Sequence, residues 1–189
     1  MKDLVAERIP WVVYEAADWL RETVKPDWDI FEWGSGGSTT FFLSLGADVV
    51  SVEHDPKWFA KVKAATSTCD KWSGHCLPPK IGGGGALAPS MRHPGCFNDY
   101  VQAFLRTQPW DAVWDLVFVD GRARNHCAKL AAPRIKPGGW LVLDNSDRAD
   151  YKPTFDLLRD WAMVEFHGHG PLSDILWKTT MWRKPGGTP

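Results

Sequence analysis

The sequence lacks the marks of membrane-spanning, disulfide-linked and nucleic-acid-binding proteins. Its 189 residues contain no apolar run long enough to cross a membrane, and its first residues contain no apolar signal segment. Lysine and arginine together number 22 against 23 acidic residues, an even balance that argues against a nucleic-acid partner. The four cysteines form no C-x-x-C pair, so reduced thiols and a cytoplasmic location are expected.

Strand and helix patterns alternate along most of the chain. Apolar runs predict strands at 28–33, 49–52, near 76–77, and at 115–119, 140–143, 163–166 and 175–182. Helices are expected over 10–24, 39–45, 57–65, 99–106, 124–134 and 153–161. This alternation predicts a single α/β domain over 1–189, with a doubly wound, mostly parallel sheet and helices on both faces.

The segment from about 66 to 98 differs from the rest of the chain. It contains the run Gly82–Gly85, several prolines and most of the cysteines, and a loop of this length is typically a lid. We therefore expect a lid insertion here. Its histidines and cysteines supply enough ligands for zinc in a spacing that matches no standard zinc pattern, so zinc stays an open question. These residues are Cys69, His75, Cys76, His93 and Cys96.

Acidic residues stand at four predicted strand ends: Glu32, Glu53, Asp120 and Asp144. In an open parallel sheet the ligand lies beyond the carboxyl ends of the strands. The convergence of these acids predicts an active site at that edge, with Asp120 and Asp144 as the candidate catalytic residues.

The stretch Phe31–Thr40 reads FEWGSGGSTT and predicts a strand, a tight glycine turn and a helix N-terminus. A nicotinamide-binding turn would have a third glycine where this chain has Thr39. Glu32, two residues before the first glycine, is a carboxylate that needs a compensating partner if it is half-buried. The ammonium group of a bound amino acid would supply one, and the N–H groups at Ser38 and Thr39 could hold the carboxylate of the same amino acid.

Glu53 follows Glu32 by 21 residues and is placed to accept hydrogen bonds from both hydroxyls of a ribose. A ligand that combines an amino acid with a ribose is S-adenosylmethionine. At this point the chain resembles the class I S-adenosylmethionine-dependent methyltransferases. The resemblance runs from the glycine turn through Glu53 and Asp120 to the Lys136–Gly139 turn and the closing strands.

The resemblance implies a Rossmann-like sheet of seven strands with the last antiparallel, and a gate helix over about 10–24 that covers the cofactor. It also implies adenine contacts from His54 and from residues near Asn98. The cofactor-binding residues expected are Glu32, Gly34, Ser35, Gly36, Ser38, Thr39, Glu53, His54 and Asp120.

Asp120 and the pair Asp144-Asn145 offer oxygen ligands that suit Mg²⁺. This arrangement resembles the metal site of the catechol O-methyltransferase group, which places a lysine three residues after the first acid. Here Ala123 takes that position, between Arg122 and Arg124. Two interpretations stay open: a Mg²⁺ ion that holds an acceptor hydroxyl, or a metal-free network in which the arginines pair with the acids.

The sequence therefore predicts a methyltransferase that uses S-adenosylmethionine, releases S-adenosylhomocysteine and methylates a small-molecule acceptor, with oxygen as the expected target. Aminopropyl transfer from decarboxylated S-adenosylmethionine on the same scaffold is an alternative. A non-catalytic S-adenosylmethionine-binding protein is another, against which Asp120 and Asp144 speak, because ligand storage does not require them.

Overall fold

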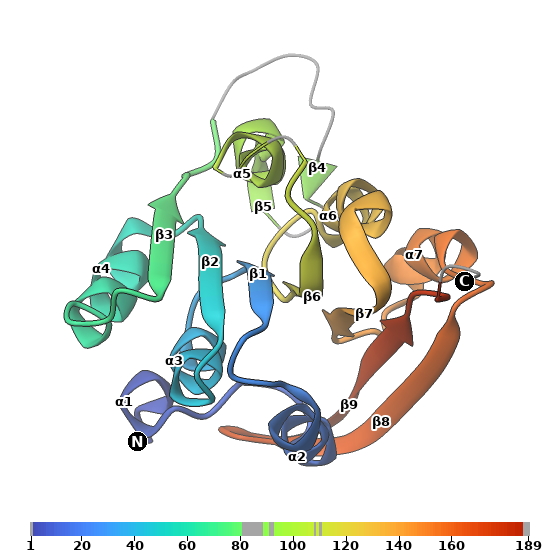
Figure 1. The fold of residues 1–189 in the computed structure, drawn as a ribbon, viewed down its shortest axis with the longest axis horizontal. Coiled ribbons are helices and arrows are strands. Elements are labelled where there is room, and N and C mark those ends of the chain that lie inside the picture. The colour runs from blue at the N-terminus through green and yellow to red at the C-terminus, as the bar shows by residue number, and fades with distance from the viewer. Residues whose placement is uncertain (1, 81–88, 91–92, 108, 110, 187–189) are drawn as a thin grey trace.

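A seven-stranded sheet forms the centre of the protein (Figure 1). The computed structural model describes residues 2–80, 89–90, 93–107, 109 and 111–186. The strands of the sheet are β1 (Asp29–Trp33), β2 (Asp48–Glu53), β3 (Trp72–Cys76), β6 (Trp114–Val119), β7 (Ile135–Asp144), β8 (Ala162–Gly170) and β9 (Ser173–Arg183). Their order is β3-β2-β1-β6-β7-β9-β8; β9 runs antiparallel to both β7 and β8, and the other neighbouring pairs are parallel. The predicted mostly parallel sheet with an antiparallel last strand is confirmed.

Helices cover both faces of this sheet, as expected from the alternating pattern. The helices are α1 (Leu4–Glu7), α2 (Tyr14–Thr23), α3 (Gly37–Ser44), α4 (Pro56–Ala65), α5 (Asn98–Arg106), α6 (Arg124–Ala131) and α7 (Lys152–Leu157). Figure 1 shows α5, α6 and α7 on one face and α2 and α3 on the other. Within the described ranges, no helix combines the length and apolar character that a membrane span requires.

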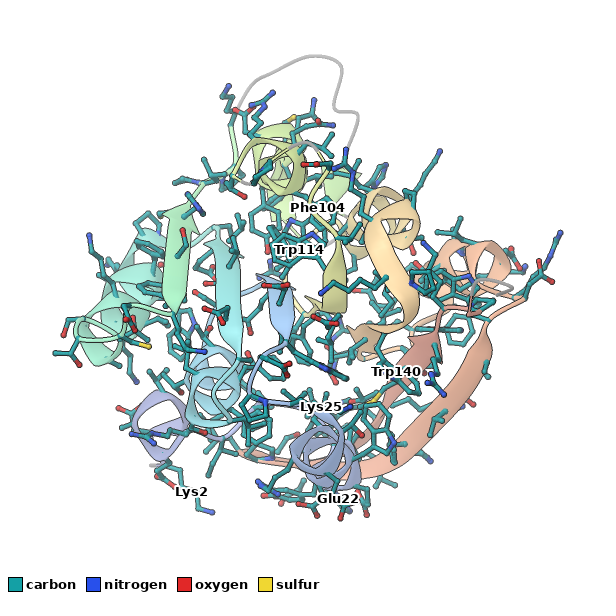
Figure 2. All side chains as sticks on the ribbon, in the orientation of Figure 1. Lys2, Glu22, Lys25, Phe104, Trp114 and Trp140 are labelled. Atoms are coloured by element: carbon teal, nitrogen blue, oxygen red, sulfur yellow. The ribbon has the colours of Figure 1, made fainter. Side chains whose placement is uncertain are left out.

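Aromatic side chains fill the core between the sheet and α5. The ring of Phe31 lies 4.7 Å from that of Trp33, 4.8 Å from that of Phe104 and 5.2 Å from that of Trp114, measured between centroids. Figure 2 shows Phe104 and Trp114 together above the middle of the sheet. Phe31 and Trp33 share this face because side chains two residues apart in a strand point the same way. Many of the tryptophans therefore serve the core.

The N-terminal segment departs from the gate helix expected over 10–24. Helix α2 begins only at Tyr14, residues 9–13 are not helical, and the unpredicted helix α1 precedes them. Asp3 caps α1 by accepting hydrogen bonds from the amides of Val5 and Ala6. The expectation of one continuous helix was wrong because apolar spacing does not distinguish a helix from an extended segment that is buried on one side.

The lid expected over 66–98 is also corrected. Residues 72–76 form the edge strand β3, parallel to β2, and so belong to the central sheet. Two further strands, β4 (Pro89–Ser90) and β5 (His93–Cys96), pair with each other outside that sheet. The run Gly82–Gly85 lies outside the described residues. The strand expected near 76–77 is thus present as β3, but it begins earlier, at Trp72. Its start was not predicted because Trp72–Cys76 contains a glycine and few strand-forming side chains.

Other boundaries shift by a few residues. Helix α6 ends at Ala131 and continues as a 3₁₀ turn to Arg134, and α7 ends at Leu157, before the predicted Trp161. The predicted turn at 137–139 is an excursion within β7, where Gly138 has a φ of +79°.

The aromatic cluster makes the first testable prediction. Phe31→Ala should lower the free energy of unfolding by about 3–5 kcal/mol, because it removes a large, fully buried side chain and leaves a cavity among three rings. Chemical denaturation measures this change. Val113→Ala is the control, because Val113 is 47% exposed and its truncation should cost less than about 1 kcal/mol. A loss in Phe31→Ala no larger than in the control would contradict the assignment of this core.

Candidate functional site

The turns after β1 and β6 touch at the carboxyl edge of the sheet. A Cβ on residue 34 would lie 2.9 Å from the amide nitrogen of Gly121, and Gly34 has a φ of +97°. Glycine is therefore required at position 34 both for its backbone conformation and for the close approach. The Gly34 amide donates to the carbonyl of Val52, and the Asp120 amide to that of Trp33. These bonds fix the acids of the three central strand ends relative to one another.

Glu32 lies beneath the glycine turn with no exposed surface. Its Oε2 accepts a hydrogen bond of 2.5 Å from the Thr39 hydroxyl, and its Oε1 accepts one from the Ser38 hydroxyl. Burial raises the pKa of the Glu32 carboxyl to about 8, and the two hydroxyl contacts act in the opposite direction. The compensating partner expected from a ligand ammonium is thus supplied by the first turn of α3.

Helix α3 begins directly behind the turn, and the N-terminal segment lies over it. A Cβ on residue 37 would lie 2.0 Å from the carbonyl oxygen of Ile9, so only glycine permits this contact. The Thr40 hydroxyl donates to the carbonyl of Val5 over 2.8 Å. The first amides of a helix have no acceptor within the helix, and they favour an anion.

Glu53 ends β2 with its side chain almost fully buried. Its Oε1 accepts hydrogen bonds from the amides of His54 at 2.7 Å and Asp55 at 2.8 Å, and His54 Nδ1 lies 2.7 Å from the same oxygen. On the other side of the imidazole, Arg122 Nε donates to His54 Nε2 over 3.3 Å. Within the described part of the chain, these contacts all use Oε1 of Glu53, and Oε2 accepts no hydrogen bond.

A cleft of about 400 Å³, here called the glycine-turn cleft, opens above these residues. Ser35, on its wall, has a buried Oγ without a hydrogen-bond partner in the described chain. Trp58 lies against the turn and donates from Nε1 to the Ser35 carbonyl over 2.6 Å. The lining residues are Leu4, Trp11, Gly34, Ser35, Gly36, Gly37, Ser38, Glu53, His54, Asp55, Trp58, Asp120, Gly121, Arg122 and Arg124.

Arg124, buried at the start of α6, joins the ends of β6 and β7. Its Nη2 lies 2.9 Å from Asp120 Oδ1 and donates to the Asp120 carbonyl over 2.6 Å. Its Nε donates to the carbonyl of Gly121 over 3.0 Å, and its Nη1 donates to the carbonyl of Asp144. The enclosed position of Asp120 raises the pKa of its carboxyl, and the Arg124 guanidinium opposes that shift.

Asp144 has its own set of donors. Its Oδ1 accepts hydrogen bonds from Trp177 Nε1 at 2.9 Å and from the Thr179 hydroxyl at 2.6 Å. Burial raises the pKa of this carboxyl, with Arg124 acting against the shift. Both donors come from β9, which explains why an antiparallel strand beside β7 matters for the site.

A second cleft, of about 600 Å³, lies beside the first and is here called the hairpin cleft, because the β8–β9 hairpin forms one wall. Trp11, Asp120 and Arg124 line both clefts. The rim carries exposed apolar side chains, among them Ile175, which is 74% exposed. The lining residues are Trp11, Asp120, Arg124, Asp144, Asn145, Asp147, Arg148, Ser173, Ile175, Leu176 and Trp177.

The expected site residues gather at this edge, with two exceptions. Of the cofactor candidates, Glu32 and Thr39 lie behind the glycine turn and do not line its cleft, while the other candidates do. Asp99, expected near an adenine, lines other clefts. Trp58 was not predicted as a lining residue, and Trp11 was predicted only as part of the gate helix expected over about 10–24. The position of Trp58, one turn after the Asp55 N-cap of α4, is a signal that could have identified it.

The arrangement does not fit the expected Mg²⁺ site at Asp120, Asp144 and Asn145. Arg124 already neutralises the Asp120 carboxylate, and Oδ1 of Asp144 is occupied by two donors. A divalent ion needs several free oxygen ligands and is repelled by an adjacent guanidinium. The metal-free network is the interpretation that the geometry supports. Across the described ranges, no three His, Cys, Asp or Glu side chains are grouped as a metal site, including those of the predicted zinc set that are described.

No protein-family model matches the chain, and no curated protein matches it. Solved structures do. A methyltransferase-like protein from Silicibacter pomeroyi is 25% identical, with a TM-score of 0.56 over 93% of this chain and 88% of that one.

Two further structures are similar at lower identity. An O-methyltransferase from Bacillus cereus, in complex with S-adenosylhomocysteine, is 16% identical, with a TM-score of 0.64 over 97% of this chain and 91% of that one. An rRNA methylase from Streptococcus thermophilus is 11% identical, with a TM-score of 0.62 over 91% and 95% of the two chains. The chain has the fold of the S-adenosylmethionine-dependent methyltransferases, so the resemblance expected from the sequence is confirmed at the level of the fold.

The buried carboxyl of Glu32 predicts a pH dependence of stability. The pKa of Glu32 is about 8 in the native protein against its usual 4.5, so the unfolded chain binds fewer protons between these values. Through this group, stability should decrease as the pH rises across that interval, by on the order of 1 kcal/mol per pH unit. Glu32→Gln should remove the contribution and flatten the dependence of Tm on pH between about pH 5 and pH 8.

Differential scanning calorimetry across that pH range measures the effect. The control is Glu22→Gln, which alters an exposed glutamate on α2 and should keep the wild-type slope. If the slope for Glu32→Gln equals that of the wild type, the buried Glu32 is not protonated in the native state.

Proposed function

We propose that the protein is an S-adenosylmethionine-dependent methyltransferase that methylates an oxygen of a small molecule. The observation that carries this proposal is the pair of adjoining clefts at the carboxyl edge, which share the Asp120–Arg124 wall. One cleft suits a donor that combines an amino acid with a nucleoside, and the other suits an acceptor. A methyl transfer requires the two molecules to meet end to end, and adjoining clefts provide that alignment.

The glycine-turn cleft offers a complementary group for each part of the donor. The N-terminus of α3 favours the amino-acid carboxylate, and Asp120 offers a carboxylate to the ammonium. We assign Glu53 Oε2 to a ribose hydroxyl because this carboxylate accepts hydrogen bonds from the described residues through Oε1, and the buried Oγ of Ser35 has no hydrogen-bond partner among those residues. Because decarboxylated S-adenosylmethionine lacks the anionic end that α3 favours, methyl transfer is preferred over aminopropyl transfer.

The hairpin cleft supports a small acceptor that is not a nucleic acid. Three aspartates and two arginines line it, which gives it no excess of positive charge for a phosphate backbone. Exposed side chains of Trp11, Ile175 and Leu176 offer an apolar surface for the body of the acceptor. An rRNA methylase shares the fold, but the charges of this cleft favour a small apolar molecule with a hydroxyl group.

The chain's own residues define the chemistry. S-adenosylmethionine, when bound, supplies a methyl group activated by a sulfonium. Asp144 is the candidate base, because burial raises the pKa of its carboxyl and so increases its tendency to take a proton. Trp177 and Thr179 both donate to its Oδ1, so we assign the proton transfer to Oδ2. The acceptor oxygen gives its proton to Asp144 and bonds to the methyl carbon, and the sulfur keeps the electron pair of the broken C–S bond.

The donor assignment predicts binding of S-adenosylhomocysteine. Glu53→Gln should weaken this binding by about tenfold or more, because it replaces a charged acceptor for the ribose with a neutral one. Isothermal titration calorimetry measures the affinity, with Glu22→Gln as the control that keeps wild-type binding. Well-folded wild-type protein that binds neither S-adenosylmethionine nor S-adenosylhomocysteine would rule out the proposed function. Tighter binding of decarboxylated S-adenosylmethionine would favour aminopropyl transfer instead.

The assignment of Asp144 predicts a separation of catalysis from donor binding. Asp144→Asn should lower the methylation rate by about 10²-fold or more and leave S-adenosylhomocysteine affinity unchanged, because Asp144 lines only the hairpin cleft. Formation of S-adenosylhomocysteine with a panel of phenols and aliphatic alcohols measures the rate. Asp156→Asn, on the exposed face of α7, is the control. A variant with the wild-type rate would show that Asp144 is not the base.

A further inference from the structure

The most unusual feature of the paired clefts is a buried guanidinium in the wall between them. Arg124 is only 7% exposed, yet it lines both the glycine-turn cleft and the hairpin cleft. Arginine is rarely buried to this extent unless its charge is paired and its N–H groups are bonded. Its partners are the Asp120 carboxylate and the carbonyls of the two loops that follow β6 and β7.

The hydrogen-bonding capacity of Arg124 is almost but not fully used. A guanidinium has five N–H bonds in a rigid plane. Three of them donate to the carbonyls of Asp120, Gly121 and Asp144. A fourth, on Nη2, is assigned to the ion pair with Asp120, whose Oδ1 lies 2.9 Å from Nη2. Among the described residues, the second N–H of Nη1 has no acceptor, and the Tyr151 ring centroid lies 5.7 Å from the guanidinium carbon. Nη1 is the nitrogen that donates to the main-chain carbonyl of Asp144, the residue whose carboxyl is the candidate base.

We propose that Arg124 is the built-in cation of the acceptor site, and that it takes the place a divalent metal ion would otherwise hold between Asp120 and Asp144. In this role its remaining N–H binds the acceptor oxygen while Asp144 removes the proton from that oxygen. The proposal rests on the methyltransferase function proposed above, and it adds a residue and a substrate class to it.

The charges around Arg124 support this role. Asp120 and Asp144 are two carboxylates in a poorly solvated wall, and such a pair requires a cation nearby. Arg124 provides a charge fixed by four contacts, whereas a metal ion would have to be recruited from solution. If the guanidinium were removed, the two carboxylates and the Asn145 side chain would remain as oxygen ligands of the kind that Mn²⁺ and Mg²⁺ prefer.

The same charge narrows the class of acceptor. A guanidinium stabilises an oxygen that gains negative charge as its proton leaves, and it repels a protonated amine. The apolar rim formed by Trp11 and Ile175 contacts the body of the acceptor. The acceptor class is therefore an apolar or aromatic molecule with an acidic hydroxyl group, such as a phenol or an enol.

Binding of Mn²⁺, followed by electron paramagnetic resonance, tests the proposal without an acceptor. The wild-type protein should bind no Mn²⁺ at this wall, with or without S-adenosylhomocysteine. Arg124→Gln, which keeps much of the side-chain volume without the charge, and Arg124→Ala should each gain a Mn²⁺ site at least about tenfold tighter than any wild-type binding. Arg124→Lys keeps the charge and should gain none.

Two further variants make the result specific. Arg122→Gln is the matched control, because Arg122 lies in the same turn but bonds to His54 and lines only the glycine-turn cleft; it should gain no Mn²⁺ site. Arg124→Gln combined with Asp144→Asn should lose the Mn²⁺ site that Arg124→Gln gains.

The proposal would be overturned if the wild-type protein bound Mn²⁺ and Asp120→Asn or Asp144→Asn abolished that binding. This measurement does not depend on the folding of an Arg124 variant. A folded Arg124→Gln protein without a Mn²⁺ site would overturn it as well. Thermal unfolding of each sample reports whether the variant is folded. S-adenosylhomocysteine titration of the wild type tests the proposed function separately, so a failure of that function is distinguishable from a failure of this inference.

Discussion

The burial of negative charge at the carboxyl edge of the sheet is the constraint on which the site depends. Glu32, Glu53, Asp120 and Asp144 end neighbouring strands or stand next to those ends, and none can be left uncompensated in a poorly solvated place. Each acid has different partners: hydroxyls contact Glu32, backbone amides contact Glu53, and Arg124 contacts Asp120. Asp144 accepts hydrogen bonds from Trp177 and Thr179. The types of residue around each carboxylate are thus determined largely by its need for hydrogen-bond donors or a positive charge.

The sheet could be predicted because its signals are local. Each central strand is a short apolar run, and Asp55-Pro56 marks the start of α4 in two adjacent residues. Once the strands are parallel, their carboxyl ends must lie at one edge, so the convergence of the acids also follows from the sequence. The partners of those acids follow only as one of two open interpretations, because Arg124 contacts Asp144 from a different element and could equally have faced solvent.

The errors share a physical origin in elements that depend on tertiary contacts. Helix α1 is four residues long, too short to be stable in isolation, and it exists because it packs on α3 through Val5 and Thr40. The strand expected near 76–77 is present as β3, but its start at Trp72 was missed because it contains Gly74 and little apolar character and is held by its pairing with β2. Glu32 was expected to face a ligand because Ser38 and Thr39, six and seven residues further along and in helix α3, cannot be identified as its partners from spacing alone.

The wall between the two clefts is where the buried charges lie next to the space for ligands. A metal ion at such a site would bring charge but would also hold its own water molecules and could dissociate. A guanidinium tied to three carbonyls and a carboxylate keeps its position before any ligand arrives, which is the condition under which electrostatic stabilisation of a reacting oxygen is most effective. The same contacts hold the loops after β6 and β7 together, so one side chain fixes both the charge and the shape of the wall. In the proposed function, the alignment of donor and acceptor across this wall would therefore depend on Arg124 as much as on the glycine turn.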